Sequence, residues 1–340
     1  MKNSRRDSLA HNRLIYISKG IRERCRAYLS NYRDDKTNEL QFVGRGNLGV
    51  VSFHLPLIYM KAKKDGVDFY ELLNYYLEMV RKIHLRRYEY VGKAKASSNP
   101  LMWMQGGAYG GNLKADDTIE SIIKSFTISF GITALNELQL LHNNTSLKND
   151  NSFAKEVMSY INSYVDRIKE EDNRLYAIYF TPSESLSGLQ AKQFKDKFGE
   201  IKGIFDKDYV TNGFHLHVSE EVTPFEKQDL EEELFHSGKG GHIQYGRFGN
   251  PKNLKALKTF ILRGLNKGFY VGVNFGQCTC EDCGHEFVGE GVEHEVCPNC
   301  NSSTITEVSR INGYMGYRTI KGDTTLNAPK LSEINDRKSM

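Results

Sequence analysis

Two Cys-x-x-Cys pairs, Cys280–Cys283 and Cys297–Cys300, constrain this chain more than any other feature of its sequence. Thirteen residues separate the pairs, and four thiolates at this spacing can surround one zinc ion with tetrahedral geometry. Gly284 and Asn301 follow the two pairs, where tight turns need residues that tolerate a positive φ. The pattern predicts a structural zinc ribbon, because four protein ligands leave no open position for catalysis.

The other two of the six cysteines stand apart from this set. Cys278 precedes the first pair at a spacing that fits a knuckle less well, so we expect it to be a spare thiol. Cys25 lies far upstream, and His285 and His294 are expected to be exposed loop residues. One metal site plus an isolated thiol is typical of a reducing compartment. The ribbon alone is compatible with a nucleic-acid-binding protein or with an enzyme.

The composition sets wider limits. The chain has 340 residues, of which 39% are hydrophobic, enough for one large domain or two ordinary ones. A formal net charge of +4 implies no strong affinity of the whole chain for a polyanion. The basic amino-terminal segment lacks the apolar core of a signal peptide, and no run approaches the roughly 20 apolar residues of a membrane helix. We therefore expect a cytoplasmic protein without membrane contact.

Apolar periodicity predicts alternating strands and helices before the cysteines. The expected strands are Leu48–Leu55, Leu175–Phe180, Phe214–Val218 and Phe269–Phe275. The expected helices are Asp68 to about Arg87, Asp117 to about Leu141, Phe153 to about Glu170, Leu189–Phe198, and Leu254 to about Leu265. Strands that alternate with long helices favour an α/β sheet or barrel.

The segment after the predicted ribbon reads Arg-Ile-Asn-Gly-Tyr-Met over Arg310–Met315. It resembles the glycyl-radical loop of the anaerobic (class III) ribonucleotide reductases, a family in which a zinc ribbon precedes this loop. The resemblance implies that Gly313 carries the radical, with Gly316 as the rival position. A radical at Cα gains stability from the flanking amide and carbonyl only if the centre becomes planar, and a side chain would obstruct that planarity.

Further matches in the same order extend the resemblance over about residues 24–320. Cys25 matches the cysteine of the family's finger loop, which implies that it becomes a thiyl radical facing Gly313. Asn47, within the run Gly44–Val51, matches an asparagine near the reacting sugar, whose amide could hold a ribose hydroxyl or formate. Segments 126–137, 209–215 and 240–245 match less strongly. We expect the histidines in or near these segments to be polar residues of the core or barrel end, with a position near the substrate as the alternative: His215, His217 and His242.

A hydroxyl-rich turn follows the predicted strand that ends at Phe180 and leads into a predicted helix. It resembles the family segment that holds substrate phosphates. The candidate phosphate-binding residues are Thr181, Ser183, Ser185 and Ser187. The free N–H groups of a helix start suit an anion, but simple N-capping of the helix is the alternative.

The resemblance implies an α/β fold that is the carboxy-terminal half of a ten-stranded α/β barrel with a central finger loop. The expected divisions are a poorly ordered leader (1–23), a barrel region (24–277), the zinc ribbon (278–302), and the glycyl-radical loop with its tail (303–340). The family's amino-terminal half has no counterpart here. We therefore expect one piece of a split reductase, associated with an amino-terminal reductase polypeptide, because half a barrel leaves strand edges unpaired.

The implied chemistry is anaerobic reduction of a ribonucleoside triphosphate, with formate as the reductant. A separate activase, carrying an iron–sulfur cluster and using S-adenosylmethionine, would generate the radical on Gly313. The assembled enzyme is expected to be a homodimer. Three alternatives stay open: a catalytically inactive remnant, another glycyl-radical enzyme, and a zinc-ribbon nucleic-acid-binding protein.

Overall fold

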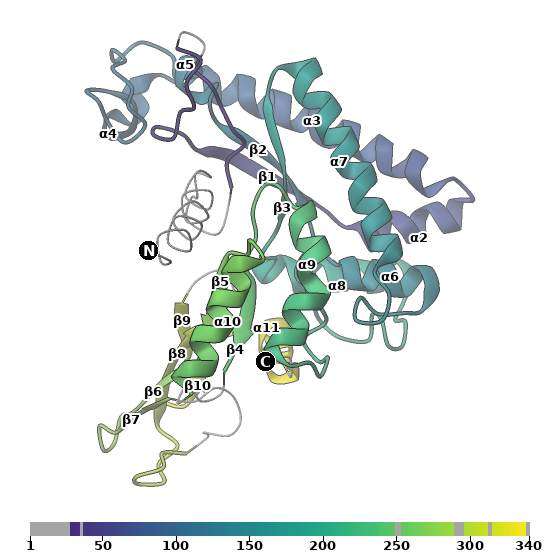
Figure 1. The fold of residues 1–340 in the computed structure, drawn as a ribbon, viewed down its shortest axis with the longest axis vertical. Helices are drawn as coiled ribbons and strands as arrows, with labels where there is room; N and C mark the ends of the chain where they lie inside the picture. The colour runs from purple at the N-terminus through teal and green to yellow at the C-terminus, as the bar shows by residue number, and fades with distance from the viewer. Residues whose placement is uncertain (1–27, 35–36, 249–252, 289–295, 312–314, 338–340) are drawn as a thin grey trace, which may run out of the picture.

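The computed structural model describes residues 28–34, 37–248, 253–288, 296–311 and 315–337. It has two parts, an α/β body built on parallel strands and a smaller antiparallel sheet that carries the cysteines (Figure 1). No helix of these described residues is both long enough and apolar enough to cross a bilayer.

The body is organised around parallel strands. In one sheet β1 (Asn47–Phe53), β2 (Thr127–Ile132) and β3 (Leu175–Phe180) lie in that order, and in another β4 (Gln244–Arg247) pairs with β5 (Val271–Asn274). Backbone hydrogen bonds from Gly240 to Ile178 (2.5 Å) and from Phe180 to Gly241 (3.2 Å) join the approach to β4 onto β3. The strands β1 to β5 therefore follow one another in chain order.

Helices connect these strands and cover them. The long helices are α2 (Leu55–Asp65), α3 (Phe69–Gly92), α6 (Leu135–Asn143), α7 (Ser152–Asp172), α8 (Glu184–Phe198), α9 (Pro224–Ser237), α10 (Leu254–Asn266) and α11 (Ala328–Asp336). Short helical turns are η2 (Ala96–Ser98), α4 (Pro100–Trp103) and α5 (Glu120–Ile123). The Asp68 side chain accepts a hydrogen bond from the Glu71 amide and so caps α3, while Thr223 and Glu226 form a capping box at the start of α9.

The core lies between the sheet and its covering helices. Strand β2 is buried along its whole length, as expected for a parallel strand covered on both faces. Phe130 from β2, Leu77 from α3 and Ile161 from α7 are fully buried in one hydrophobic cluster. This cluster fixes the sheet β1-β2-β3, which carries Asn47 in β1 and leads from β3 into the hydroxyl-rich segment.

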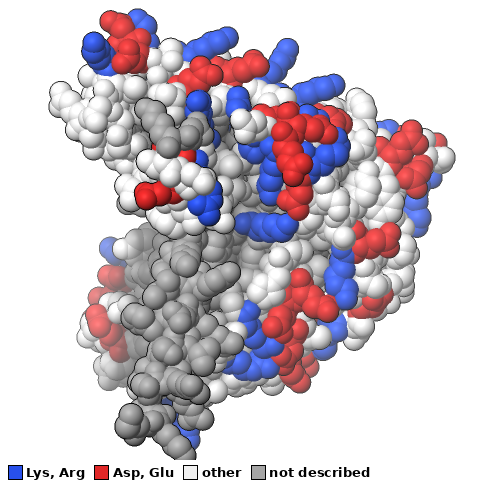
Figure 2. Space-filling model, turned by 45° about the horizontal axis from the view of Figure 1, so that its top comes forward, with Lys and Arg blue, Asp and Glu red and all other residues white. Residues whose placement is uncertain are grey.

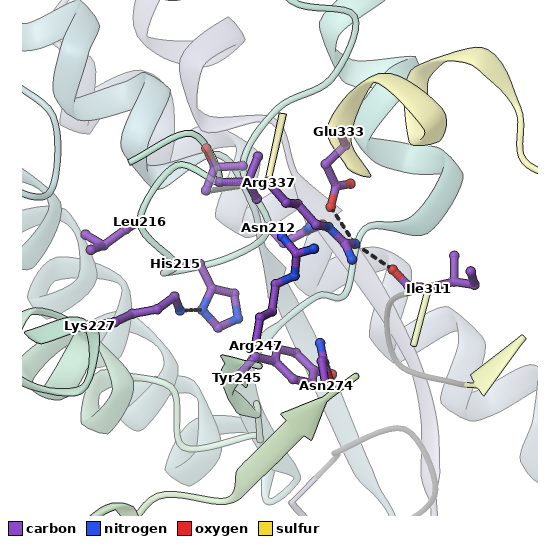
Figure 3. Close-up of a pocket in the computed structure, with 12 residues that line it drawn as sticks. Asn212, His215, Leu216, Lys227, Tyr245, Arg247, Asn274, Ile311, Glu333 and Arg337 are labelled. Carbon is purple, nitrogen blue, oxygen red and sulfur yellow. Dashed lines mark hydrogen bonds and ion pairs between the residues drawn. The ribbon is translucent and has the colours of Figure 1, made fainter. Parts of the chain in front are cut away.

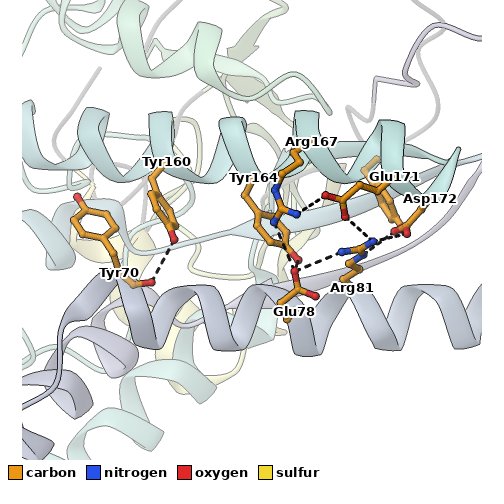
Figure 4. Close-up of polar contacts among 9 residues, drawn as sticks. Tyr70, Glu78, Arg81, Tyr160, Tyr164, Arg167, Glu171 and Asp172 are labelled. Carbon is orange, nitrogen blue, oxygen red and sulfur yellow. Dashed lines mark hydrogen bonds and ion pairs between the residues drawn. The ribbon is translucent and has the colours of Figure 1, made fainter.

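Charged and polar side chains join α3 to α7 outside this core (Figure 4). The Arg81 guanidinium donates to the two carboxylate oxygens of Asp172 at 2.8 and 2.6 Å. The Tyr164 hydroxyl donates to Glu78 at 2.8 Å. Among the described residues on the face shown in Figure 2, acidic and basic side chains are interspersed and form no extended surface of a single sign.

The second sheet contains β6 (Gln277–Cys280), β7 (Glu286–Val288), β8 (Ile305–Arg310), β9 (Met315–Ile320) and β10 (Asp323–Thr324). Its strands are antiparallel, in the order β10-β9-β8-β6-β7. The predicted division between residues 302 and 303 falls inside this one sheet. The predicted ribbon is therefore continuous, through β6 and β8, with the strands that flank the predicted radical loop.

Two of the predicted elements are wrong. The stretch Asp117–Leu141 is not one helix but α5, strand β2 and α6, because its apolar middle is inserted between β1 and β3. Phe214–Val218 is not a strand in this structure. Apolar residues do alternate in burial here, since Phe214 and Leu216 are buried. The backbone nevertheless forms a turn, in which the His215 amide donates to the Asn212 carbonyl at 3.2 Å. By contrast, strand Leu175–Phe180 has the predicted bounds.

Candidate functional site

The four cysteines of the predicted knuckles meet beside the antiparallel sheet. Their sulfur atoms all lie within 4.8 Å of one another. Sγ of Cys280 is 3.5 Å from Sγ of Cys300, and Sγ of Cys283 is 3.6 Å from Sγ of Cys297. Zn–S bonds of about 2.3 Å in a tetrahedron place sulfurs roughly 3.8 Å apart. The four donors therefore fit a structural zinc ion.

The turns after each knuckle adopt the predicted backbone conformation. Gly284 has φ of 71° and Asn301 has φ of 61°. Each turn closes with an amide-to-carbonyl hydrogen bond, from Gly284 to Cys280 at 2.9 Å and from Asn301 to Cys297 at 2.8 Å. The left-handed conformation explains why these positions hold glycine and asparagine.

Cys278 takes no part in the cluster of four sulfurs. It is buried in β6 opposite Glu307, and burial together with the Glu307 charge raises the pKa of its thiol to about 12. It is therefore a neutral core thiol, in agreement with the expectation from its spacing. His285 is exposed, as predicted, and His294 lies outside the described residues.

The chain proposed to carry the radical glycine connects β8 to β9. Arg310 at the end of β8 pairs with Met315 at the start of β9, and Gly313 lies between them, outside the described residues. Ile311, on the near side of the loop, is 3% exposed. The rival Gly316 pairs with Ser309 as an ordinary member of β9. Both flanks of the predicted loop are thus fixed by sheet pairing or by burial.

Cys25 also lies outside the described residues, but the chain that follows it is firmly attached to the body sheet. The Tyr28 amide donates to the Gly240 carbonyl at 2.7 Å. The Ser30 amide donates to Thr127 Oγ1 at 2.9 Å, and its hydroxyl donates to the Tyr176 carbonyl at 3.0 Å. The segment that emerges from the predicted finger loop therefore lies along β2 and β3.

Asn47 is half-buried at the first position of β1. Its Nδ2 donates to Ser129 Oγ at 2.7 Å, and its Oδ1 accepts a hydrogen bond from the Gly49 amide at 2.7 Å. A carboxamide has two N–H bonds and two lone pairs, so one donor and one acceptor stay available for a ligand. The two contacts fix the plane in which that ligand would be held.

Only residues 181–183 of the hydroxyl-rich segment lie between β3 and α8, because α8 begins at Glu184 rather than at the predicted Leu189 and so includes Ser185 and Ser187. Thr181 Oγ1 lies 2.9 Å from Ser52 Oγ, and Ser185 is exposed. The Ser187 hydroxyl is buried, donates to the Val210 carbonyl at 2.7 Å and accepts from the Val210 amide at 3.1 Å. Ser187 therefore holds the neighbouring loop against α8.

Ser183 occupies the N-cap position of α8 without capping the helix. Its φ of 61° is in the left-handed region, and its hydroxyl donates to the Thr181 carbonyl at 3.3 Å. Helix starts without a side-chain cap leave backbone N–H groups available to an anion. A non-glycine residue at positive φ is sparsely populated, and such residues cluster at ligand-binding turns.

A pocket lies at the carboxyl ends of β4 and β5, next to Ile311 (Figure 3). Its lining comprises Thr211, Asn212, His215, Leu216, Val218, Lys227, Tyr245, Arg247, Asn274, Ile311, Glu333 and Arg337. Oδ1 of Asn212 and Oδ1 of Asn274 are buried without a hydrogen-bond partner among the described residues. Such oxygens can accept hydrogen bonds from a polar ligand, because burying them unpaired is costly.

A buried charge network supports one wall of this pocket. Glu231 is fully buried and lies 2.5 Å from Lys227 Nζ and 3.1 Å from His215 Nδ1. Burial alone would raise the pKa of Glu231, but the charges of Lys227 and His215 outweigh it and lower that pKa to about 2. The carboxylate therefore stays ionised and orients His215 toward the pocket.

The other two histidines have the structural roles expected first. His242 is buried, with its ring centroid 3.6 Å from that of Phe235. His217 Nδ1 lies 2.7 Å from Ser219 Oγ. Sequence reasoning missed the arginines of the pocket, Arg247 and Arg337, because nothing in their local sequence distinguishes them from solvent-exposed residues.

Comparison with known proteins gives one family throughout. The family model described as anaerobic ribonucleoside-triphosphate reductase matches residues 14–340. The Haemophilus influenzae and Escherichia coli proteins of that name are 33% and 32% identical to this chain and span 92% of it, but only 45% of each relative is covered. The enterobacteria phage T4 protein is 30% identical, with 52% covered. The chain thus spans about half the length of these relatives.

Solved structures agree on the fold. A structure described as an anaerobic ribonucleotide reductase superposes with a TM-score of 0.64 at 16% identity, over 91% of this chain and 47% of that one. The Thermotoga maritima anaerobic ribonucleotide reductase gives a TM-score of 0.59 at 17% identity, over 85% of this chain and 46% of that one. The mixed α/β fold is therefore shared with these structures.

Proposed function

The chain belongs to the anaerobic ribonucleoside-triphosphate reductase family, and we propose that it is the carboxy-terminal, catalysis-bearing part of such an enzyme. In this proposal Gly313 carries a glycyl radical and Cys25 a transient thiyl radical. The observation that carries the proposal is the course of β8, which starts at Ile305 opposite Cys280 and leads to Ile311 at the edge of the pocket. The expected radical glycine falls in the connection from β8 to β9.

The proposed reaction begins when a separate iron–sulfur activase, using S-adenosylmethionine, removes a hydrogen atom from Gly313. Cys25 then gives its sulfhydryl hydrogen to the Gly313 radical and becomes a thiyl radical. The thiyl radical abstracts the 3′ hydrogen of a ribonucleoside triphosphate, and the 2′ hydroxyl leaves as water. Formate supplies the two reducing electrons and is oxidised to carbon dioxide.

The body supplies the proposed contacts to the substrate. Thr181, Ser183 and Ser185 surround the uncapped start of α8, where backbone N–H groups would bind phosphate oxygens. Ser187 would support this turn through its two hydrogen bonds to Val210. Asn47 would hold a ribose hydroxyl or formate with the donor and acceptor that its own contacts leave available.

The four cysteines are proposed to hold zinc in a structural role. Cys280 ends β6, and β6 pairs with β8, the strand that leads to Gly313. When bound, zinc would neutralise and cross-link the four thiolates. The knuckles would thereby fix β6 and, through its pairing, the base of the proposed radical loop.

The remaining part of the enzyme would come from an amino-terminal reductase polypeptide. Among the described residues, β1 pairs only with β2 and β5 pairs only with β4, so both ends of the parallel strand order have an open edge. Open edges of parallel strands need a covering partner. We propose that this polypeptide completes a ten-stranded barrel around the finger loop, and that the completed enzyme forms a homodimer in the cytoplasm.

Oxygen-dependent cleavage tests the radical assignment. After anaerobic activation and brief exposure to air, the wild-type chain should be cut at Gly313 and show a doublet radical signal before exposure. Gly313→Ala should abolish both the signal and the cut, whereas Gly316→Ala should retain them. An uncut wild-type chain that nevertheless displays the radical signal would contradict the assignment to Gly313.

Reconstitution tests the reductase assignment separately. The full chain, mixed with its amino-terminal polypeptide and the activase, should convert a ribonucleoside triphosphate to the deoxy form only when formate is supplied. Cys25→Ser should remove turnover while leaving the glycyl radical in place. Turnover that survives in Cys25→Ser would overturn the proposed role of this thiol, and a radical without any turnover would favour the inactive remnant.

A further inference from the structure

Helix α11 carries a buried charge cluster beside the pocket. Glu333 is 2% exposed, and its carboxylate pairs with Lys330 and, at 3.0 Å, with Arg337. Burial alone would raise the pKa of Glu333, but the charges of Arg337 and Lys330 outweigh it and lower that pKa. Because the carboxylate stays ionised, it holds the Arg337 side chain in a fixed position.

Arg337 uses the same nitrogen to reach the β8–β9 connection (Figure 3). Its Nη2 donates to the Ile311 carbonyl at 2.8 Å and to Glu333 Oε1 at 3.0 Å. Ile311 is buried and immediately precedes residues 312–314. Its carbonyl lies beyond the last β8–β9 pair, Arg310 with Met315, so α11 rather than the sheet holds it.

Helix α11 also contacts the body at its first turn and at its last residue. Pro329 packs so closely on Gly188 of α8 that a Cβ at Gly188 would lie 2.7 Å from the Pro329 Cβ. Near the end of α11, the Tyr209 hydroxyl donates to Asp336 at 2.9 Å, and Lys207 pairs with Asp336 at 3.0 Å. Helix α11 is therefore anchored to the body independently of Arg337.

We propose that Arg337, held by Glu333, is a positioning residue that fixes the chain entering the Gly313 loop through its hydrogen bond to the Ile311 carbonyl. The contact between Arg337 and Ile311 is part of the structure, and only its expected effect on the Gly313 radical rests on the proposed function. A charge-assisted hydrogen bond to the carbonyl of a buried residue is strong enough to limit local opening of this segment. Its loss should free the loop base without unfolding the body.

Hydrogen exchange of the full, unactivated chain tests the contact directly. In Arg337→Ala, amide exchange of the peptide spanning residues 309–318 should rise roughly tenfold, while peptides from α3 and α7 keep the wild-type rate. Arg337→Lys should restore part of the protection, because an ammonium can still donate to the carbonyl. Lys207→Ala is the matched control, since it removes an ion pair of α11 that does not touch Ile311.

The possible results distinguish failure of the Arg337–Ile311 contact from failure of the proposed radical function. The proposal would be overturned if the 309–318 peptide exchanged in Arg337→Ala at the wild-type rate. It would also be overturned if Lys207→Ala raised the exchange rate of that peptide as much as Arg337→Ala does. If Arg337→Ala does not fold, Arg337→Gln, which is too short to reach the carbonyl, takes its place. After activation, the radical signal per chain should fall at least several-fold in Arg337→Ala but not in Lys207→Ala. An absent signal in the wild-type chain would count against the proposed function and leave the exchange result standing.

Discussion

The α/β body and the antiparallel sheet are held together by different forces. The main hydrophobic cluster draws its buried side chains from residues 53–269, all within the body. The antiparallel sheet buries few apolar groups apart from its cysteines, and β9 leaves Met315, Tyr317 and Ile320 exposed. It has instead its strand pairing and four sulfurs gathered within 4.8 Å of one another. The strands that lead into the proposed radical loop thus belong to the part that carries the proposed zinc site.

This difference means that each part can be perturbed without the other. Removing the proposed zinc ion should affect the sheet, and removing a core side chain should affect the body.

Loss of the metal should have the largest effect. Cys297→Ser, or chelation of the wild-type protein, should release about one zinc ion per chain and unfold the region 277–320. Structural zinc sites contribute on the order of 10 kcal/mol. Metal analysis and hydrogen exchange would follow both effects, with Cys278→Ala as the control that retains zinc. Unfolding of α3 and α7 in zinc-free protein would refute the separation.

A cavity in the body should leave the metal in place. Phe130 is fully buried in the core of β2, and Phe130→Ala should cost about 3–5 kcal/mol of unfolding free energy. Denaturant unfolding would measure the loss, and zinc content should stay at the wild-type value. Release of zinc by this substitution would show that the two parts unfold as one unit.

Lowering the pH should reduce the unfolding free energy of the α/β body, because it protonates Glu231. Its pKa of about 2 in the folded protein lies below the usual 4.5, so its contribution is complete above pH 4.5 and is lost as the pH falls toward 2. The shift corresponds to about 3 kcal/mol. The difference in unfolding free energy between wild type and Glu231→Gln should shrink over this range. A difference that does not change with pH would refute this reading.

Removing the side-chain cap of α9 should have the smallest effect on stability. Thr223 Oγ1 accepts a hydrogen bond from the Glu226 amide at the start of α9, and Thr223→Ala should cost about 1 kcal/mol. Thr223→Ser keeps the hydroxyl and serves as the control in thermal unfolding. Equal losses for both variants would assign the effect to the methyl group rather than to the cap.

Features that depend only on neighbours along the chain could be predicted before the fold was known. The spacing of Cys280–Cys283 and Cys297–Cys300 was enough to predict a four-sulfur site, and the turns at Gly284 and Asn301 have the predicted backbone. Strand Leu175–Phe180 was also predictable, because a continuous apolar run is a local signal, whereas helix α8 begins five residues before the predicted start at Leu189. The family followed from motifs of the same kind.

Tertiary structure alone decided which distant residues meet. The helix expected over Asp117–Leu141 gave way to β2, because insertion between β1 and β3 outweighs a local preference for helix. The pocket gathers side chains from the 211–218 segment, β4, β5 and α11, and the contact of Arg337 with Ile311 spans 26 residues. Nothing near Arg337 in the sequence signals that contact, since it depends on the path of the whole intervening chain rather than on any local pattern.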